Sequence, residues 1–252
     1  AVPENCPSVR FAAEMALMDL ECGGKQLLLN NAFSRGQESI LINGLIWMDS
    51  QEHMLRQAEE LVQRGFTTLK MKIGMLPFAD ELIWLEAVRE LASRSKGVAL
   101  RVDANGAFSK RDADWTPEQK LIKLAELGVQ SIEQPLIPSD REGLAELCAL
   151  SPIPIALDES LIGVFGDDRI RLVEEIRPQF LILKPSLLGG LSSADAWVRL
   201  AETNGVGWWV TSALESNVGL NAIAQWTAGH LEGAQDPLPQ GLGTGGLFSN
   251  TP

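Results

Sequence analysis

Five charged residues stand near the ends of five successive apolar segments, and their types could support acid–base chemistry at a metal ion. They are Lys72 in TTLKMKIG, Asp103 in ALRVDANG, Glu133 in QSIEQPL, Asp158 in PIALDES and Lys184 in FLILKPS. Successive members are 31, 30, 25 and 26 residues apart, about one strand–helix unit. An ion inside a strand costs several kcal/mol to bury unless a partner or a metal compensates it. The pattern therefore predicts an enzyme with a cation site beside acid/base lysines.

The three carboxylates, Asp103, Glu133 and Asp158, are the predicted metal ligands. Each one alone could instead cap the following helix or pair with a neighbouring strand. The chain has only two histidines, so zinc chemistry based on histidine is nearly excluded. Three oxygen donors suit Mg²⁺, with Mn²⁺ as an alternative, because a hard cation takes oxygen ligands and keeps positions open for substrate.

Lysines and an arginine accompany these carboxylates. Lys70 and Lys72 are two apart in a strand and so share a face, where two like charges should depress each other's pKa and leave one as a general base. The alternative is an edge strand with two solvated lysines. Arg101 shares a face with Asp103 and would bind a substrate carboxylate or hold a metal ligand in place. Lys184 ends a buried run and needs an anion, a catalytic role or a structural salt bridge.

Alternating strands and helices must position these residues. Strand-like segments cover 40–47, 67–74, 99–106, 130–136, 153–160, 179–185 and 207–214, and PQGLGTGG (239–246) is a candidate eighth strand. Helix-like segments cover 7–22, 51–64, 78–95, 117–127, 140–150, 167–176, 192–204 and 217–229. Thr116-Pro117 and Ser192-Ser193 are helix start signals.

This order predicts an α/β fold, a TIM-type (β/α)7β barrel, because strands with nearly continuous apolar runs are buried under helices on both faces. Its 252 residues are about what such a barrel needs. Residues 40–252 are assigned to the barrel and residues 1–39 to a preceding helix and linker.

Charge and cysteine content limit the partners. The net charge of −12 argues against nucleic acid and anionic membranes, while a local cluster of lysines and metal could still attract an anionic substrate. Cys6, Cys22 and Cys148 are far apart and odd in number, which predicts reduced thiols in a cytoplasmic protein. No apolar run of 18 residues occurs. The oligomeric state stays open.

A glycine-rich segment, GLGTGG, matches the dinucleotide pattern G-x-G-x-x-G at Gly241, Gly243 and Gly246. Only six residues follow it, so no strand–helix–strand unit can be built there, and the match is weak. A rim whose backbone amides face a substrate anion is the better interpretation.

At these residues the sequence resembles the enolase superfamily, in its muconate-lactonizing-enzyme-like subgroup. The strings TLKMKIG, RVDANGAF, SIEQPL, ALDES and LKPSLLGG carry the resemblance in the expected order. The superfamily uses a lysine or histidine base with Mg²⁺. Within the subgroup, INGLIWM, TSALESNVGLNAIAQWT and GLGTGGLF are most similar to the o-succinylbenzoate synthase family of menaquinone biosynthesis. The resemblance covers about residues 7–252.

The resemblance implies a role for each matching residue. Asp103, Glu133 and Asp158 would bind Mg²⁺, which would hold a substrate carboxylate. Lys72 would abstract the α-proton, Lys184 would stabilise the enolate, and Lys70 would keep the pKa of Lys72 low. The reaction would be a syn dehydration giving 2-succinylbenzoate. Substrate contacts would come from Arg101, Asn105, Ser212, Gly241 and Gly243.

The chain departs from the family in one respect. The family carries an N-terminal α+β capping domain, of which only the last helix and linker, residues 1–39, are expected here. The chain is therefore expected to be a fragment, or its activity to be low.

Three related reactions and one non-catalytic role remain alternatives. N-succinylamino-acid racemases, dipeptide epimerases and muconate cycloisomerases share the barrel and the lysines. A dipeptide epimerase is expected to have an Asp-x-Asp motif where this chain reads GLGTGG. A non-catalytic barrel is disfavoured because all five charged residues are present.

Overall fold

Strands and helices alternate from residue 44 onward in the computed structural model, which describes residues 2–94 and 97–245. The strands are β1 (Gly44–Ile46), β2 (Thr68–Lys72), β3 (Ala99–Asp103), β4 (Val129–Glu133), β5 (Ile155–Leu157), β6 (Phe180–Leu183) and β7 (Gly207–Val210). The helices are α1 (Pro7–Glu21), α2 (Gln51–Gln63), α3 (Phe78–Ser93), α4 (Pro117–Glu126), α5 (Arg141–Leu150), η1 (Glu159–Leu161), α6 (Asp168–Ile176), α7 (Pro185–Leu188), α8 (Leu191–Thr203) and α9 (Asn217–Leu231).

Each strand and helix predicted from the pattern is present, apart from the eighth strand discussed below. Two short elements, η1 and α7, were not predicted. The helix predicted over 78–95 ends at Ser93, and residue 95 lies outside the described part of the chain.

Contacts between Cα atoms divide the described chain into two units. Residues 43–160 and 170–181 form one, which we call the strand-rich unit. The remaining described residues form the other, the terminal unit. Asp103, Glu133, Asp158, Lys70 and Lys72 all belong to the strand-rich unit, so the geometry among them can be described within one body.

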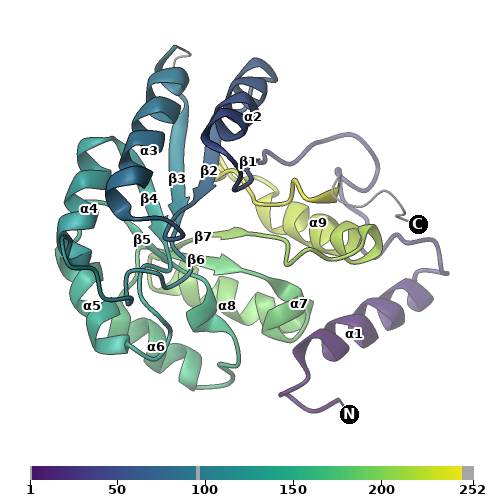
Figure 1. The fold of residues 1–252 in the computed structure, drawn as a ribbon. Coiled ribbons are helices and arrows are strands. Elements are labelled where there is room, and N and C mark those ends of the chain that lie inside the picture. The colour runs from purple at the N-terminus through teal and green to yellow at the C-terminus, as the bar shows by residue number, and fades with distance from the viewer. Residues whose placement is uncertain (1, 95–96, 246–252) are drawn as a thin grey trace. The chain divides into compact units, whose positions relative to one another are not determined.

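The sheet of the strand-rich unit is parallel, and its strands follow one another in chain order from β1 to the start of β6. The register sets Lys72 beside Asp103, and Asp103 beside Glu133. Two residues earlier in each strand, Arg101 lies between Lys70 and Ser131. Helices α3, α4 and α5 lie against one face of these strands (Figure 1). Parallel pairing therefore brings charges that are about 30 residues apart in the sequence to one edge of the sheet.

Alternation along the strands separates an apolar face from a charged one. Leu69, Met71, Leu100, Val102 and Ile132 are each at most 1% exposed and alternate with the charged positions. Successive side chains in a strand point to opposite faces, so the apolar set packs under the helices while the charged set shares the other face. Burial of the apolar set fixes the register, since a slip of one residue would exchange the faces.

Two predicted helix starts had different outcomes. Thr116 forms a capping box with Gln119 at the start of α4, as predicted. The start predicted at Ser192-Ser193 is wrong, because α8 begins at Leu191 after Gly190. The N–H groups of Leu191 and Ser192 donate to the carboxylate of Glu14, at 2.5 and 3.0 Å. A carboxylate from a distant helix thus caps α8, in place of a local hydroxyl.

In the terminal unit the segment 239–242 takes the place predicted for an eighth strand. Gln240 forms a parallel bridge with Ile42, and Gly241 forms one with Thr211. The N–H of Gly241 donates to Val210 O, at 2.7 Å. Within the described residues these are isolated bridges, so the segment pairs like a strand without the length of one.

The cysteines are free, as predicted, and burial raises the pKa of the Cys148 thiol to about 12. Among the helices that the structure describes, none has the length and apolar character needed to cross a membrane.

Candidate active site

Three carboxylates meet at the ends of β3, β4 and β5. Asp103 and Glu133 are the last residues of β3 and β4, and Asp158 follows β5 directly. One carboxylate oxygen from each lies within 4.8 Å of the others, and the residues are 2, 3 and 2% exposed. The sequence prediction that these three side chains converge is confirmed.

The cluster has the composition of a site for a hard divalent cation. All three donors are carboxylate oxygens, and they are buried together although like charges repel. Lys70 pairs with Asp103 and Glu133, and Lys72 lies 3.9 Å from Asp103. Three buried carboxylates with oxygens this close together are the donor set that a hard divalent cation prefers, so the residues fit the metal that the resemblance implies.

Lys70 lies between two of the carboxylates. Its Nζ donates to Glu133 Oε1 at 2.7 Å and lies 3.0 Å from Asp103 Oδ2. Burial alone would lower the pKa of Lys70, but the negative charges of Glu133 and Asp103 outweigh burial, and the pKa is raised above its usual value. The expectation that the two lysines depress each other's pKa is therefore wrong for Lys70, because the neighbouring carboxylates dominate over Lys72.

Lys72 is the more accessible lysine, with 42% of its side chain exposed against 11% for Lys70. Its Nζ lies 3.9 Å from Asp103 Oδ2 and donates to Asn105 Oδ1 at 2.7 Å. Asn105 also donates to Glu159 Oε1, at 2.9 Å, and its backbone has a positive φ of 44°. The amide thus holds the amine of Lys72 at the edge of the cluster, open to a ligand.

Arg101 lies deeper than the cluster. It is 3% exposed, and its Nε donates to Gln130 Oε1 at 3.0 Å. Burial lowers the pKa of Arg101 to about 10, partly offset by the charge of Glu133. Of the two roles that the sequence left open, this position favours support of a metal ligand over direct contact with substrate.

The remaining predicted residues belong to the terminal unit. Lys184 directly follows β6, is half-buried and precedes α7. Ser212 Oγ donates to Glu215 Oε2 at 2.6 Å, and Glu215 also accepts from the hydroxyl of Ser186. Gly243 is exposed. Gly246, the last glycine of the dinucleotide pattern, lies outside the described residues.

The expectation for Gly241 is wrong in one respect. Its N–H donates to Val210 O, so this amide does not face a substrate anion. A Cβ at Gly241 would meet Thr211 Cγ2 at 2.5 Å, so the close approach to Thr211, the residue after β7, favours glycine here.

Sequence reasoning missed Gln134, which joins two of the metal-ligand candidates. It follows Glu133, is 0% exposed and has a φ of 40°. Its Oε1 accepts from the N–H groups of Asp158 and Ser160, at 3.0 and 3.1 Å. Its Nε2 donates to Leu136 O and Ser160 Oγ, at 2.8 and 2.7 Å. The polar residue between Glu133 and Pro135 in SIEQPL was the only available signal.

Known proteins resemble this chain in sequence and fold. The Enolase C-terminal domain-like family matches residues 53–234. The o-succinylbenzoate synthase of Desulfotalea psychrophila is 48% identical over 244 residues, which are 97% of this chain and 64% of that protein. The L-Ala-D/L-Glu epimerase of Bacillus subtilis is 31% identical over 88% of this chain and 59% of its own length. The crystal structure of MenC from Desulfotalea psychrophila superposes with a TM-score of 0.87 at 46% identity, over 98% of this chain and 66% of that one.

The chain spans about three fifths of the length of these curated relatives. The predicted α/β fold of the enolase superfamily, related to muconate-lactonizing enzymes, agrees with both the family match and the structural likeness. The predicted resemblance is confirmed: the chain belongs to the Enolase C-terminal domain-like family.

Proposed function

We propose that this chain carries the active site of an o-succinylbenzoate synthase. The reaction would be the syn dehydration of 2-succinyl-6-hydroxy-2,4-cyclohexadiene-1-carboxylate to 2-succinylbenzoate in menaquinone biosynthesis. The observation that carries the proposal is the accessible amine of Lys72 at 3.9 Å from a buried cluster of three carboxylates. The likeness to the Desulfotalea psychrophila synthase, at 48% identity, supports this reaction among those open to such a site.

Asp103, Glu133 and Asp158 are the proposed ligands of Mg²⁺, with Mn²⁺ as an alternative. When bound, the metal would supply positive charge that neutralises a substrate carboxylate and so acidifies the adjacent carbon. Lys70 pairs with Glu133 and Asp103 and would balance part of their negative charge. Arg101, two residues before Asp103 on β3, would stabilise the negative charge of Glu133.

Lys72 is the proposed general base and later the general acid. Its neutral amine takes the α-proton, and the electron pair of the C–H bond enters the enolate. The resulting ammonium then returns this proton to the departing hydroxyl as the C–O bond breaks, so water leaves and the ring becomes aromatic. Asn105 orients the amine for both transfers through its hydrogen bond to Nζ. Lys184 is the proposed cation that stabilises the enolate.

The terminal unit would recognise the substrate. We assign contact with the succinyl tail to Ser212 and to the segment from Gly241 to Gly243. Residues 1–39 are the proposed end of a capping domain, and the barrel begins at residue 40. The partner would be this small carboxylate, and neither nucleic acid nor a membrane. The protein would act in the cytoplasm.

Dehydration of the cyclohexadiene substrate, followed by the absorbance of its aromatic product, tests the proposal. We expect turnover with Mg²⁺, none with a chelator, and a loss of about 10²–10⁴-fold in kcat for Lys72→Ala, the range for a general acid or base. Asp158→Asn serves as the metal-site control, and calorimetry should find Mg²⁺ binding in Lys72→Ala but not in Asp158→Asn. Mg²⁺ binding by the wild type without dehydration would reject the reaction and keep the metal site.

Racemisation of an N-succinyl amino acid is the second candidate. Lys72 is the last residue of β2 and Lys184 directly follows β6, and a lysine on each side of a carbon acid would serve 1,1-proton transfer as well as dehydration. Measuring loss of optical activity beside dehydration separates the two. Faster racemisation than dehydration would replace the first proposal by the second.

A further inference from the structure

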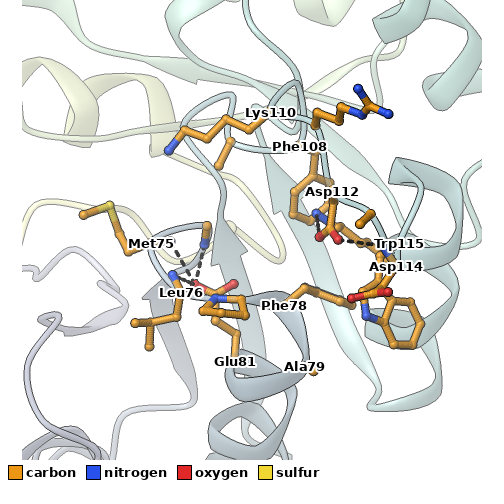
Figure 2. A pocket seen from close by; sticks show the side chains of 16 residues that line it. Met75, Leu76, Phe78, Ala79, Glu81, Phe108, Lys110, Asp112, Asp114 and Trp115 are labelled. Carbon is orange, nitrogen blue, oxygen red and sulfur yellow. Dashed lines mark hydrogen bonds and ion pairs between the residues drawn. The ribbon is translucent and has the colours of Figure 1, made fainter.

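A buried carboxylate from α3 holds the turn that follows Lys72. Glu81 Oε1 accepts hydrogen bonds from three consecutive backbone N–H groups, those of Gly74, Met75 and Leu76, at 2.6, 3.0 and 3.2 Å (Figure 2). Glu81 is 2% exposed. One oxygen therefore fixes the path of the chain immediately after the proposed base.

This turn is packed tightly against the turn that carries Asn105. Gly74 has a φ of +93°, and a Cβ there would meet the Cβ of Ala107 at 2.2 Å. The N–H of Ile73 donates to Asp103 O at 2.8 Å. Lys72, the last residue of β2, directly precedes the first turn, and its acceptor Asn105 lies in the second. A shift of either turn would move the amine relative to its acceptor.

Lys120, on α4, holds the segment that follows Asn105. It is 6% exposed, lies 2.8 Å from Asp112 Oδ2, and its Nζ sits 4.9 Å from the ring centre of Phe108 and 5.5 Å from that of Phe78. Residues of both turns line one cavity of about 360 Å³, together with Glu81 and Asp112 (Figure 2) and with Lys120. Glu81, which binds the turn after Lys72, and Lys120, which pairs with Asp112, therefore line the same cavity.

Packing alone would favour an apolar residue at position 81. Burial raises the pKa of the Glu81 carboxyl, against the opposing effect of its backbone hydrogen bonds. Leu85 and Val88, on the same helix, are apolar and at most 1% exposed. A carboxylate in that environment is retained at a cost, which is common where a residue shapes a functional site.

We propose that Glu81 is a positioning residue for Lys72. It acts through the backbone of residues 74–76, and the Lys120–Asp112 pair holds the facing turn in register. The inference rests on the proposed function, because it assigns to Glu81 the alignment of the amine that takes the substrate proton. It predicts a role in the proton-transfer step and none in metal binding.

The test compares Glu81→Ala, Glu81→Gln and Val88→Ala in the dehydration reaction. Glu81→Ala should lower kcat about tenfold or more with KM and the Kd for Mg²⁺ within twofold, because a displaced amine impairs proton transfer. Glu81→Gln keeps an acceptor oxygen and should recover most of kcat. Val88→Ala, a destabilised α3 with Glu81 intact, should keep kcat. Substrate deuterated at the reacting carbon should show a larger isotope effect on kcat in Glu81→Ala alone.

A second measurement keeps the inference separate from the reaction. Lysines of the Mg²⁺-bound protein are reductively methylated with ¹³C, and the Lys72 signal is assigned by its loss in Lys72→Arg. In wild type and Val88→Ala we expect the Lys72 signal at a chemical shift that differs from those of the exposed lysines. In Glu81→Ala its chemical shift should move toward theirs. An unchanged Lys72 signal or an unchanged kcat in Glu81→Ala would overturn the inference. A wild type without dehydratase activity but with the expected signals would reject only the proposed function.

Discussion

Lys70 places a positive charge between Asp103 and Glu133, which would otherwise repel each other. Its pKa is raised, so its stabilising effect is fully present below the unfolded value of 10.5 and is lost only as the pH rises through the higher folded value. Between neutral pH and about 10 its contribution should therefore be constant. This separates it from Lys72, whose amine must lose a proton to act as a base.

We expect Lys70→Met to destabilise the metal-free protein by about 3–5 kcal/mol, because Asp103 and Glu133 would stay buried without the ammonium that lies between them. Urea unfolding at neutral pH measures the change. Lys123→Met is the matched control: Lys123 forms an exposed pair with Glu126, and its loss should cost at most about 0.5 kcal/mol. Equal losses in the two variants would contradict the assigned role of Lys70.

Gln134 uses its whole side-chain amide to hold the backbone around two carboxylates. Gln134→Ala should weaken Mg²⁺ binding about 10–100-fold, the usual effect of removing a group that orients metal ligands. Isothermal titration without substrate gives the Kd directly. Thr227→Val, at a buried polar position in the terminal unit, is the control and should leave the Kd unchanged. Equal affinity in wild type and Gln134→Ala would show that Gln134 does not position the ligands.

At the scale of elements, the site depends on turns as much as on strands. Gly74 and Gly128 both have positive φ, but only Gly74 lacks room for a Cβ. Gly74→Ala should therefore cost about 1–3 kcal/mol more than Gly128→Ala, since both pay for the backbone conformation and only the first forces Ala107 and its turn to move. Chemical denaturation of both variants measures the difference. A cost at Gly74 no larger than at Gly128 would mean that the two turns are not closely coupled.

The strands and their charged ends were predictable because the signal is local. An apolar run followed by Asp103, Glu133 or Lys72 reports both burial and an edge of the sheet, and parallel pairing in chain order then brings the ends together. The supports of the site were not predictable in this way. Glu14, which caps α8, is 177 residues from Leu191, and Glu81 acts through a turn whose glycine is defined by contact with Ala107. Such roles depend on distances that no sequence window contains.

At the scale of the whole molecule, the metal ligands all lie in the strand-rich unit, so metal should stabilise that unit. With free Mg²⁺ about 100-fold above its Kd, linkage adds about 2.7 kcal/mol, and removal should lower Tm by roughly 5–10 °C for a chain of this size. Calorimetric scans with and without a chelator measure the shift. If the two units melt separately, the metal-dependent shift in Tm should appear only in the transition of the strand-rich unit. Asp158→Asn should abolish that shift. A shift that persists in Asp158→Asn would place the metal elsewhere.

Because the strands of the strand-rich unit pair in chain order, the ribosome delivers the carboxylates in the order in which they meet. Asp103, Glu133 and Asp158 have all been synthesised before any of β7 or α9 exists. Domains generally fold as units during synthesis, N-terminal parts first. The proposed cation would therefore bind the nascent chain while residues from 182 onward are still being translated, and it would act as a folding aid before it acts in a reaction.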